Sequence, residues 1–256
     1  MSTIASAAAG DSTGAPKVML EVEGLNAWYG AARVLFDLAL QVGRGEVVAL
    51  MGRNGAGKST TMKALMALMP RRNGTVRFRG EDISRLRPFE IARRGIGFVP
   101  EDRRIFSALT VAENLDVGRQ PPRHFADGRP APAWTENRLY ALFPNLGTMV
   151  DRRGADMSGG EQQMLTVART LMGNPLLVLL DEPSEGVAPV IVEQMAEAIV
   201  ALKQEGLSVL LSEQNIHFAA LVSDRVYVLE KGEVRWQGAM AEFAQDTAAQ
   251  RALLAM

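Results

Sequence analysis

Residues 52–59 form a glycine-rich loop whose composition suits phosphate binding. They read Gly52-Arg53-Asn54-Gly55-Ala56-Gly57-Lys58-Ser59. In this pattern of glycine, four residues and then Gly-Lys-Ser, backbone N–H groups surround phosphate oxygens and the lysine reaches the β- and γ-phosphates. The serine hydroxyl binds Mg²⁺. We therefore expect a nucleotide phosphate site at residues 52–59, with Ser59 as a metal ligand.

A second glycine loop, Ser158-Gly159-Gly160-Glu161, contains no lysine. Ser158 and Glu161 have the spacing of a capping box, so one interpretation is an ordinary helix start. The two glycines, however, weaken a first helical turn and permit the close approach of a ligand, and a helix N-terminus attracts anions. The other interpretation is a loop that completes a nucleotide site held mainly by a second molecule.

Two carboxylates, Asp181 and Glu182, follow the apolar run at residues 176–180. Ligands of open α/β sheets bind at the carboxyl ends of the strands, which is where this pair is expected. Asp181 would hold Mg²⁺, through water, and Glu182 would polarise the water that attacks a γ-phosphate. The alternative is a plain strand-end turn, because Asp and Glu are common there.

The elements that position these groups follow from the hydrophobic pattern. Buried strands are expected at residues 46–51 and 176–180, directly before the first loop and the two carboxylates. Helices are expected at residues 58–69, 162–172 and 189–205. Strands that alternate with helices predict a parallel sheet.

Further strands are expected at residues 17–23 and 34–42. The dipeptides Asn73-Gly74 and Lys231-Gly232 predict two hairpins. Residues 118–134 contain four prolines with little apolar periodicity, which predicts an exposed loop.

Composition excludes several classes of protein. The 256 residues carry a net charge of −1, so we expect no nucleic-acid partner. The absence of cysteine excludes a disulfide framework and a thiolate metal site. No segment approaches the roughly 18 to 20 apolar residues of a membrane-spanning helix. Residues 1–17 lack the pattern of a secretion signal, and we expect a disordered tail there.

The chain resembles the ATP-binding subunits of ABC transporters over about residues 18–238. The resemblance depends on the motifs above and above all on Met157-Ser158-Gly159-Gly160-Glu161-Gln162-Gln163. It implies an α/β P-loop NTPase fold with a RecA-like core, a mostly parallel sheet, an antiparallel β subdomain and an inserted α-helical subdomain. Within an ATPase domain at residues 18–256, it implies the following parts: core 18–99 and 165–238, helical subdomain about 100–164, and C-terminal helical end 239–256.

The resemblance also implies roles for individual residues. Tyr29 would stack on adenine, although a core or hairpin aromatic is the alternative. ATP would be bound by Tyr29, Gly52, Arg53, Asn54, Gly55, Ala56, Gly57, Lys58, Ser59 and Thr60. The signature residues Ser158, Gly159, Gly160 and Glu161 would contact the ATP of a partner subunit.

Members of this family dimerise head to tail, and a groove in the helical subdomain receives a helix of the transmembrane subunit. Candidates for that groove are Ile105, Phe106 and Leu109, each of which could equally be core. The implied partners are a second ATPase subunit, two transmembrane permease subunits and an external solute-binding protein. The implied location is peripheral, on the cytoplasmic face of the inner membrane, and the implied cofactors are ATP and Mg²⁺.

The chain departs from the general superfamily pattern at three positions, and there it resembles the ATPases of branched-chain amino acid uptake, the LivF type. Glu101 stands where many relatives have a Mg²⁺-sensing glutamine, which makes Glu101 a candidate metal ligand. Ala188 replaces an aspartate. Gln214 occupies the place of the switch histidine, whereas His124 and His217 are poorly placed to substitute. The candidate catalytic residues are therefore Glu182 and Gln214.

A neutral glutamine cannot become a cation, so we expect weaker stabilisation of transition-state charge at the site that uses Gln214. In a heterodimer the two ATP sites would then be unequal, and the site that uses Lys58 and Glu182 would be the slower one.

Several functions remain open at this stage. The favoured one is an ATPase that powers import of a small polar or amino-acid solute, most simply branched-chain amino acids. Urea or short amides are the alternative within the same type. A soluble ABC ATPase that acts as a mechanical clamp is the alternative of another class, and the second glycine loop disfavours a P-loop kinase or GTPase.

Overall fold

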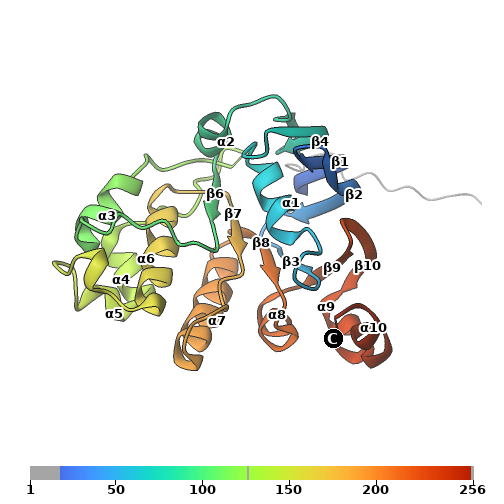
Figure 1. Cartoon of the computed structure of the whole chain (residues 1–256). Coiled ribbons are helices and arrows are strands. Elements are labelled where there is room, and N and C mark those ends of the chain that lie inside the picture. The colour runs from blue at the N-terminus through green and yellow to red at the C-terminus, as the bar shows by residue number, and fades with distance from the viewer. Residues whose placement is uncertain (1–17, 126, 255–256) are drawn as a thin grey trace, which may run out of the picture.

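The computed structural model describes residues 18–125 and 127–254, so the tail expected at residues 1–17 lies outside the described part. Two sheets dominate the structure, and helix α1 contacts strands of both (Figure 1). The larger sheet has the order β10-β9-β3-β8-β7-β6 and the smaller has the order β2-β1-β4-β5.

The larger sheet is mostly parallel, as its alternation with helices predicts. Strands β6, β7, β8, β3 and β9 run parallel to one another, and β10 pairs antiparallel with β9. The hairpin expected at Lys231-Gly232 joins β9 and β10, so this prediction is confirmed. The strands are β3 (Val47–Met51), β6 (Ile96–Val99), β7 (Leu177–Asp181), β8 (Ser208–Glu213), β9 (Arg225–Glu230) and β10 (Glu233–Ala239).

The smaller sheet is antiparallel and consists of β1 (Val18–Tyr29), β2 (Ala32–Gly43), β4 (Arg71–Phe78) and β5 (Glu81–Asp82). The hairpin predicted at Asn73-Gly74 is wrong, because both residues lie inside β4. A Cβ on Gly74 would lie 2.5 Å from the carbonyl oxygen of Gly24 on β1. The glycine therefore permits two backbones to approach at an irregular part of the β1–β4 pairing instead of making a turn.

Helices of different lengths connect the strands. They are α1 (Lys58–Leu65), α2 (Pro88–Arg94), α3 (Val111–Gly118), α4 (Glu136–Leu142), α5 (Pro144–Gly147), η1 (Gly154–Asp156), α6 (Gly159–Met172), α7 (Pro189–Gln204), α8 (Ile216–Val222), α9 (Met240–Gln245) and α10 (Thr247–Leu253). Of those described, α6 and α7 are the longest. Helix α1 ends earlier than predicted, and Ala67, just beyond it, has a positive φ of 56°.

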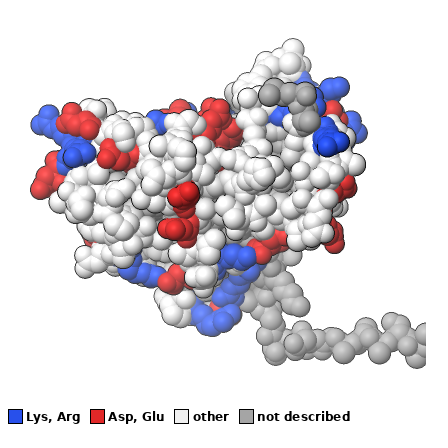
Figure 2. All heavy atoms as spheres, turned by 90° about the horizontal axis from the view of Figure 1, so that it is seen from below, with Lys and Arg blue, Asp and Glu red and all other residues white. Residues whose placement is uncertain are grey.

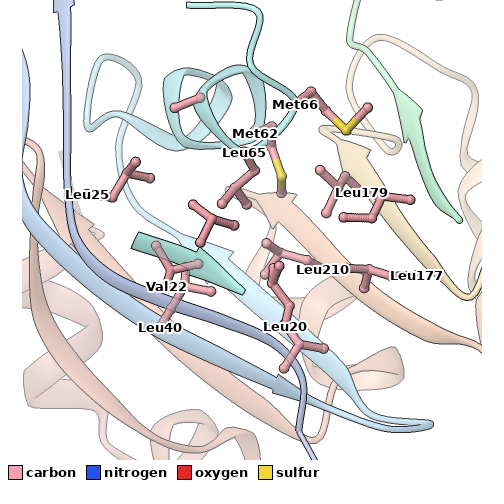
Figure 3. Packing of buried hydrophobic residues seen from close by; sticks show 14 of the residues in the cluster. Leu20, Val22, Leu25, Leu40, Met62, Leu65, Met66, Leu177, Leu179 and Leu210 are labelled. Carbon is pink, nitrogen blue, oxygen red and sulfur yellow. The ribbon is translucent and has the colours of Figure 1, made fainter. Parts of the chain in front are cut away.

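The hydrophobic core has a separate cluster on each face of the parallel sheet, because successive side chains along a strand point to opposite faces. Leu177 and Leu179 face the cluster that contains α1 and the smaller sheet, whereas Val178 and Leu180 face a second cluster with α6 and α7. Figure 3 shows Met62 and Leu65 of α1 beside the leucines of β7 and β8. Burial on both faces explains why β7 is a continuous apolar run and not an alternating one.

Residues 100–164 lie between β6 and β7 in the chain and contain α3, α4, α5, η1 and the first turns of α6. Figure 1 shows α3 to α6 grouped at one side of the larger sheet. The expected boundary between residues 164 and 165 falls inside α6. The expected loop at residues 118–134 is largely exposed, but Ala131 and Trp134 are buried.

In the described part of the chain, no helix has both the length and the apolar character needed to cross a membrane. The face in Figure 2 shows small groups of acidic and basic side chains without a broad basic area.

Candidate functional site

The glycine loop at residues 52–59 connects β3 to α1. Gly52 has a φ of +151°, and a Cβ on it would lie 2.4 Å from the carbonyl oxygen of Leu229 on β9. Gly57 has a φ of +111° at the start of α1. Both positions therefore require glycine so that the backbone can turn from the strand into the helix.

Lys58 is 3% exposed and lies folded back along its own loop. Its Nζ donates to the carbonyl oxygens of Gly52 at 2.8 Å and Arg53 at 3.2 Å, and it pairs with Glu182 Oε1 at 3.1 Å. A buried ammonium needs such partners, because an isolated charge in the interior is strongly unfavourable. The loop thus holds a pre-positioned cation at the carboxyl edge of the sheet.

Ser59 and Asp181 come together across the same edge, with Ser59 Oγ donating to Asp181 Oδ1 at 3.0 Å. Asp181 is 1% exposed, and its Oδ2 has no hydrogen-bond partner among the residues that the structure describes. Burial raises the pKa of Asp181, partly offset by the bond from Ser59. A buried carboxylate oxygen without a partner beside a serine hydroxyl fits a Mg²⁺ site completed by phosphate oxygens.

Glu182 lies directly after β7 with a φ of +50°, and its N–H donates to the carbonyl oxygen of Ser212 at 3.0 Å. Burial acts to raise the pKa of Glu182, but a hydrogen bond with Glu185, the charge of Lys58 and the amide of Gln214 outweigh it, so the net shift is downward. Glu182 is therefore a carboxylate in this state.

Gln214 follows β8 and joins the site through its amide. Its Nε2 donates to Glu182 Oε2 at 3.1 Å and to Asn54 Oδ1 at 2.6 Å. Gln214 therefore links the glycine loop to the carboxylate that follows β7. His217 and His124 are exposed.

Glu185 is an exposed residue of the turn after Glu182 and shares a hydrogen bond with it. That bond, burial and the nearby negative charges of Glu182, Glu101 and Glu213 raise the pKa of Glu185 to about 7. Near neutral pH, Glu185 is therefore protonated in part of the molecules and donates to Glu182.

Lys58, Ser59 and Glu182 line a cleft of about 490 Å³, whereas Asp181 and Gln214 contact these residues without lining the cleft themselves. The lining residues are Tyr29, Val34, Asn54, Gly55, Gly57, Lys58, Ser59, Thr60, Glu101, Glu182 and Glu185. The structure thus brings together Tyr29, Glu101 and most of the glycine loop, although these segments are far apart in the sequence. Tyr29 is 50% exposed at one end of β1, as a ring available for stacking must be.

The second glycine loop does not line this cleft. Ser158 is the N-cap of α6: Ser158 Oγ accepts from the N–H of Glu161 at 3.4 Å, and Glu161 Oε2 accepts from the N–H of Ser158 at 2.6 Å. The capping box is therefore present. A Cβ on Gly159 would lie 2.7 Å from Arg103 Nη1, and one on Gly160 would lie 2.7 Å from Ile191 Cγ1. Packing against Ile191 thus supplies a reason for Gly160 that the sequence did not show, whereas at Gly159 the flexible end of the Arg103 side chain can move aside.

Comparisons with known proteins agree with this geometry. A family model described as ABC transporter matches residues 35–185, more than half of the chain. The chain belongs to the ABC transporter family. The predictions of this family and of an ATP-hydrolysing enzyme within it are therefore confirmed.

This ABC ATPase is 42% identical over 216 residues to the high-affinity branched-chain amino acid transport ATP-binding protein BraG of Pseudomonas aeruginosa, covering 84% of this chain and 91% of BraG. It is 36% identical over 227 residues to the lipopolysaccharide export system ATP-binding protein LptB of Escherichia coli, covering 88% of this chain and 92% of LptB.

Among solved structures, a nucleotide-free ATP-binding cassette from an ABC transporter matches with a TM-score of 0.77. The match has 24% identity and covers 92% of this chain and 97% of the other. At that identity it shows the fold alone, and the predicted α/β class with an antiparallel β part and a helical part is confirmed.

Sequence reasoning missed two acidic residues at the site, Glu185 and Glu213. Glu213 is the last residue of β8 and is buried beside Gln214. The signal that identified Asp181 and Glu182, carboxylates at the end of a buried strand, was also present at Glu213. Glu185 had no comparable signal, because it lies in an irregular turn.

Proposed function

We propose that this chain is the ATP-hydrolysing subunit of a binding-protein-dependent importer of branched-chain amino acids. It would work with a second ATPase subunit, two transmembrane permease subunits and an external solute-binding protein, peripherally on the cytoplasmic face of the inner membrane, without nucleic acid. The single observation that supports the solute is the 42% identity to BraG. The geometry of the cleft supports the chemistry.

The ion pair between Lys58 and Glu182 suggests how ATP binding prepares the base. In the structure Lys58 lies 3.1 Å from Glu182 and helps to lower its pKa. Phosphate oxygens that draw Lys58 to themselves remove this counter-charge, and the pKa of Glu182 then rises. Glu182 thereby becomes a stronger general base for the attacking water when the substrate is in place.

Ser59 and Asp181, with Glu101 at the edge of the cleft, would hold Mg²⁺. When bound, the ion neutralises charge on the β- and γ-phosphate oxygens. Asn54 and Gln214 contribute uncharged hydrogen-bonding groups on the other side of Glu182. Tyr29, on the rim, would stack on the base of the nucleotide.

The signature loop would act on a partner's nucleotide, since it lies outside this chain's own cleft. We propose a head-to-tail heterodimer in which the site that uses Lys58, Glu182 and Gln214 is the slower one. The neutral amide of Gln214 supports this part, because it hydrogen-bonds without supplying positive charge. Single-turnover hydrolysis with Glu182→Gln, against the matching change in the partner, tests it, and equal losses contradict it.

A test of the partnership needs only two variants of this chain. In a dimer of identical chains, mixing Lys58→Ala with Ser158→Ala creates one composite site whose glycine loop and signature loop are both intact, so hydrolysis partly recovers. A heterodimer with a different ATPase gives no recovery. Recovery in the mixture would therefore contradict the proposed heterodimer.

A groove between α2, β6, α3 and α6 is the proposed docking site for the transmembrane subunit. It has a volume of about 580 Å³ and is lined in part by Phe89, Phe106 and Val117, which are 45%, 48% and 54% exposed. Of the three residues expected there, Phe106 lines the groove, whereas Ile105 packs against the core and Leu109 is not among the lining residues. We propose that the domain is divided as the resemblance implies, into a core at residues 18–99 and 165–238, a helical subdomain at about residues 100–164, and a C-terminal helical end at residues 239–256. The groove then lies at the border between the core and the helical subdomain.

The experiment that tests the solute uses the intact membrane complex with its binding protein. Hydrolysis should rise when the binding protein delivers leucine, isoleucine or valine. Stimulation by urea or a short amide would replace the proposed solute within the same type. Stimulation by lipopolysaccharide, the substrate system named for LptB, would overturn import altogether.

A further inference from the structure

Glu213 is a buried carboxylate with an unusual set of partners. It ends β8, is 2% exposed, and accepts hydrogen bonds from three residues, through their backbone N–H groups and, at Ser184, also through the side chain. Oε1 accepts from Ser184 at 3.1 Å, and Oε2 accepts from Gln214 at 3.0 Å and Asn215 at 3.1 Å. Burial raises the pKa of Glu213, and these bonds oppose the rise.

The three donors belong to two separate loops of the site. Ser184 lies in the turn that follows Glu182, and Gln214 and Asn215 lie in the segment that follows β8. The same two loops meet again where Gln214 Nε2 donates to Glu182 Oε2, and Gln214 also reaches Asn54 of the glycine loop. Glu213 therefore holds the backbone on both sides of the Glu182–Gln214 contact.

A carboxylate at this position is not explained by core packing. Removing a carboxylate from water is strongly unfavourable, and an apolar residue of similar size would avoid that cost. Two acceptor oxygens on one rigid group can, however, bind donors from two loops at once, which an apolar residue cannot do.

We propose that Glu213 is a positioning residue for ATP hydrolysis, which fixes Gln214 and Glu182 relative to each other by binding the backbone of both loops. The inference rests on the roles proposed above for Glu182 and Gln214. Glu213 does not line the nucleotide cleft, so it acts through these two residues and not on the nucleotide.

The decisive variant is Glu213→Gln, which keeps the size of the side chain. Its single acceptor oxygen can serve one loop, and its NH₂ group then faces an N–H donor of the other. We expect kcat to fall by about 10- to 100-fold, as for other small misplacements of reacting groups, with the affinity for ATP unchanged. An unchanged kcat would overturn the proposal.

Ser208→Ala is the matched control on the same strand. Ser208 Oγ accepts from the N–H of Gly45 at 2.9 Å at the opposite end of β8, far from the cleft. This variant should lower the melting temperature without lowering kcat per folded molecule. If Glu213→Gln also lowers only the melting temperature, Glu213 is structural and the proposal fails.

A double-mutant cycle with Gln214→Ala separates positioning from general damage. If Glu213 acts through Gln214, Glu213→Gln costs less kcat in the Gln214→Ala background than alone, whereas additive losses contradict the proposal. Should Glu213→Gln fail to fold, Glu213→Asp keeps both oxygens and serves in the same cycle. Failure of the proposed function looks different: Glu182→Gln would then leave hydrolysis intact, whatever the result at Glu213.

Discussion

The two glycine loops of this ATPase differ in what surrounds them. The loop at residues 52–59 contacts polar side chains from other parts of the site, with Lys58 buried and Ser59 bonded to Asp181. The loop at residues 158–161 caps its own helix and does not line that cleft, with Ser158 exposed. The first loop contacts its proposed catalytic partners within a single chain, whereas the second has an observed local role in the chain and a proposed chemical role in an assembly.

The largest effect on hydrolysis should come from a change beside the loop at residues 52–59. Glu182→Gln removes the proposed general base, and we expect kcat to fall by about 10²- to 10⁴-fold. ATP should still bind, because Lys58 and the backbone of the loop are retained. Single-turnover hydrolysis and equilibrium binding of ATP measure the two quantities, and a kcat close to wild type would exclude Glu182 as the base.

At the signature loop, Ser158→Ala should leave ATP affinity of the isolated chain unchanged, because the loop does not line its cleft. Hydrolysis by the assembled complex should fall by about 10- to 100-fold, the effect of one lost hydrogen bond to a charged group. A changed affinity in the isolated chain would break the contrast between the loops.

Thr110→Ala is the control for this variant. Thr110 and Glu113 form the same reciprocal capping box at α3, with bonds of 3.2 Å and 2.8 Å. Each alanine should cost about 1 kcal/mol of unfolding free energy, measured by denaturant titration. Only Ser158→Ala should also reduce hydrolysis.

A smaller effect on kcat is expected from Gln214→His, which tests whether a neutral side chain beside the loop at residues 52–59 limits hydrolysis. A protonated imidazole at this position donates a charge-assisted hydrogen bond, stronger by about 1 kcal/mol than that of a neutral amide. We expect kcat to rise about fivefold. Steady-state hydrolysis measured across pH checks this, and a gain that does not depend on pH would argue against a charged imidazole.

The smallest effect concerns Glu185 and the stability of the nucleotide-free chain. Its folded-state pKa is raised from 4.5 to about 7, so its contribution to the unfolding free energy is complete below about pH 4.5 and is lost as pH rises through about 7. Solvent screening of this exposed group limits that contribution to about 1 kcal/mol or less, which is about 2 to 4 °C in melting temperature.

Glu185→Gln should therefore flatten the decline in melting temperature between pH 5 and 8 without abolishing it, because Asp181 and Glu213 have raised pKa values as well. Calorimetry at several pH values measures the slope. Identical slopes in the two proteins would show that Glu185 does not hold a proton near neutral pH.

The sequence predicted most where a local pattern is sufficient. Short apolar runs located β3 and β7, and the Ser-x-x-Glu spacing located the start of α6. The alternation of strands with helices then predicted a parallel sheet. In such a sheet Asp181 and the glycine loop at residues 52–59 both lie at the carboxyl ends of the strands.

Prediction failed where long-range packing decides a residue's role. Asn73-Gly74 has the composition of a hairpin turn, but Gly74 serves the close approach of Gly24, which is distant in the sequence. The ligand role predicted for Gly159 and Gly160 stays a prediction, and at Gly160 packing adds a local reason for glycine, because a Cβ would lie 2.7 Å from Ile191 Cγ1. The hydrogen bonds of Glu213 involve loops whose proximity exists only in the folded sheet.

The position of β6 has a consequence for how the chain folds. This edge strand pairs with β7, from Ile96 opposite Leu177 to Val99 opposite Leu180, and all of residues 100–164 intervene. Closing so long a loop has an entropic cost before any contact is gained, and contacts of this kind slow folding. During synthesis we therefore expect β7 to pair with β6 late, so that chaperone binding or aggregation competes with maturation at this edge of the sheet.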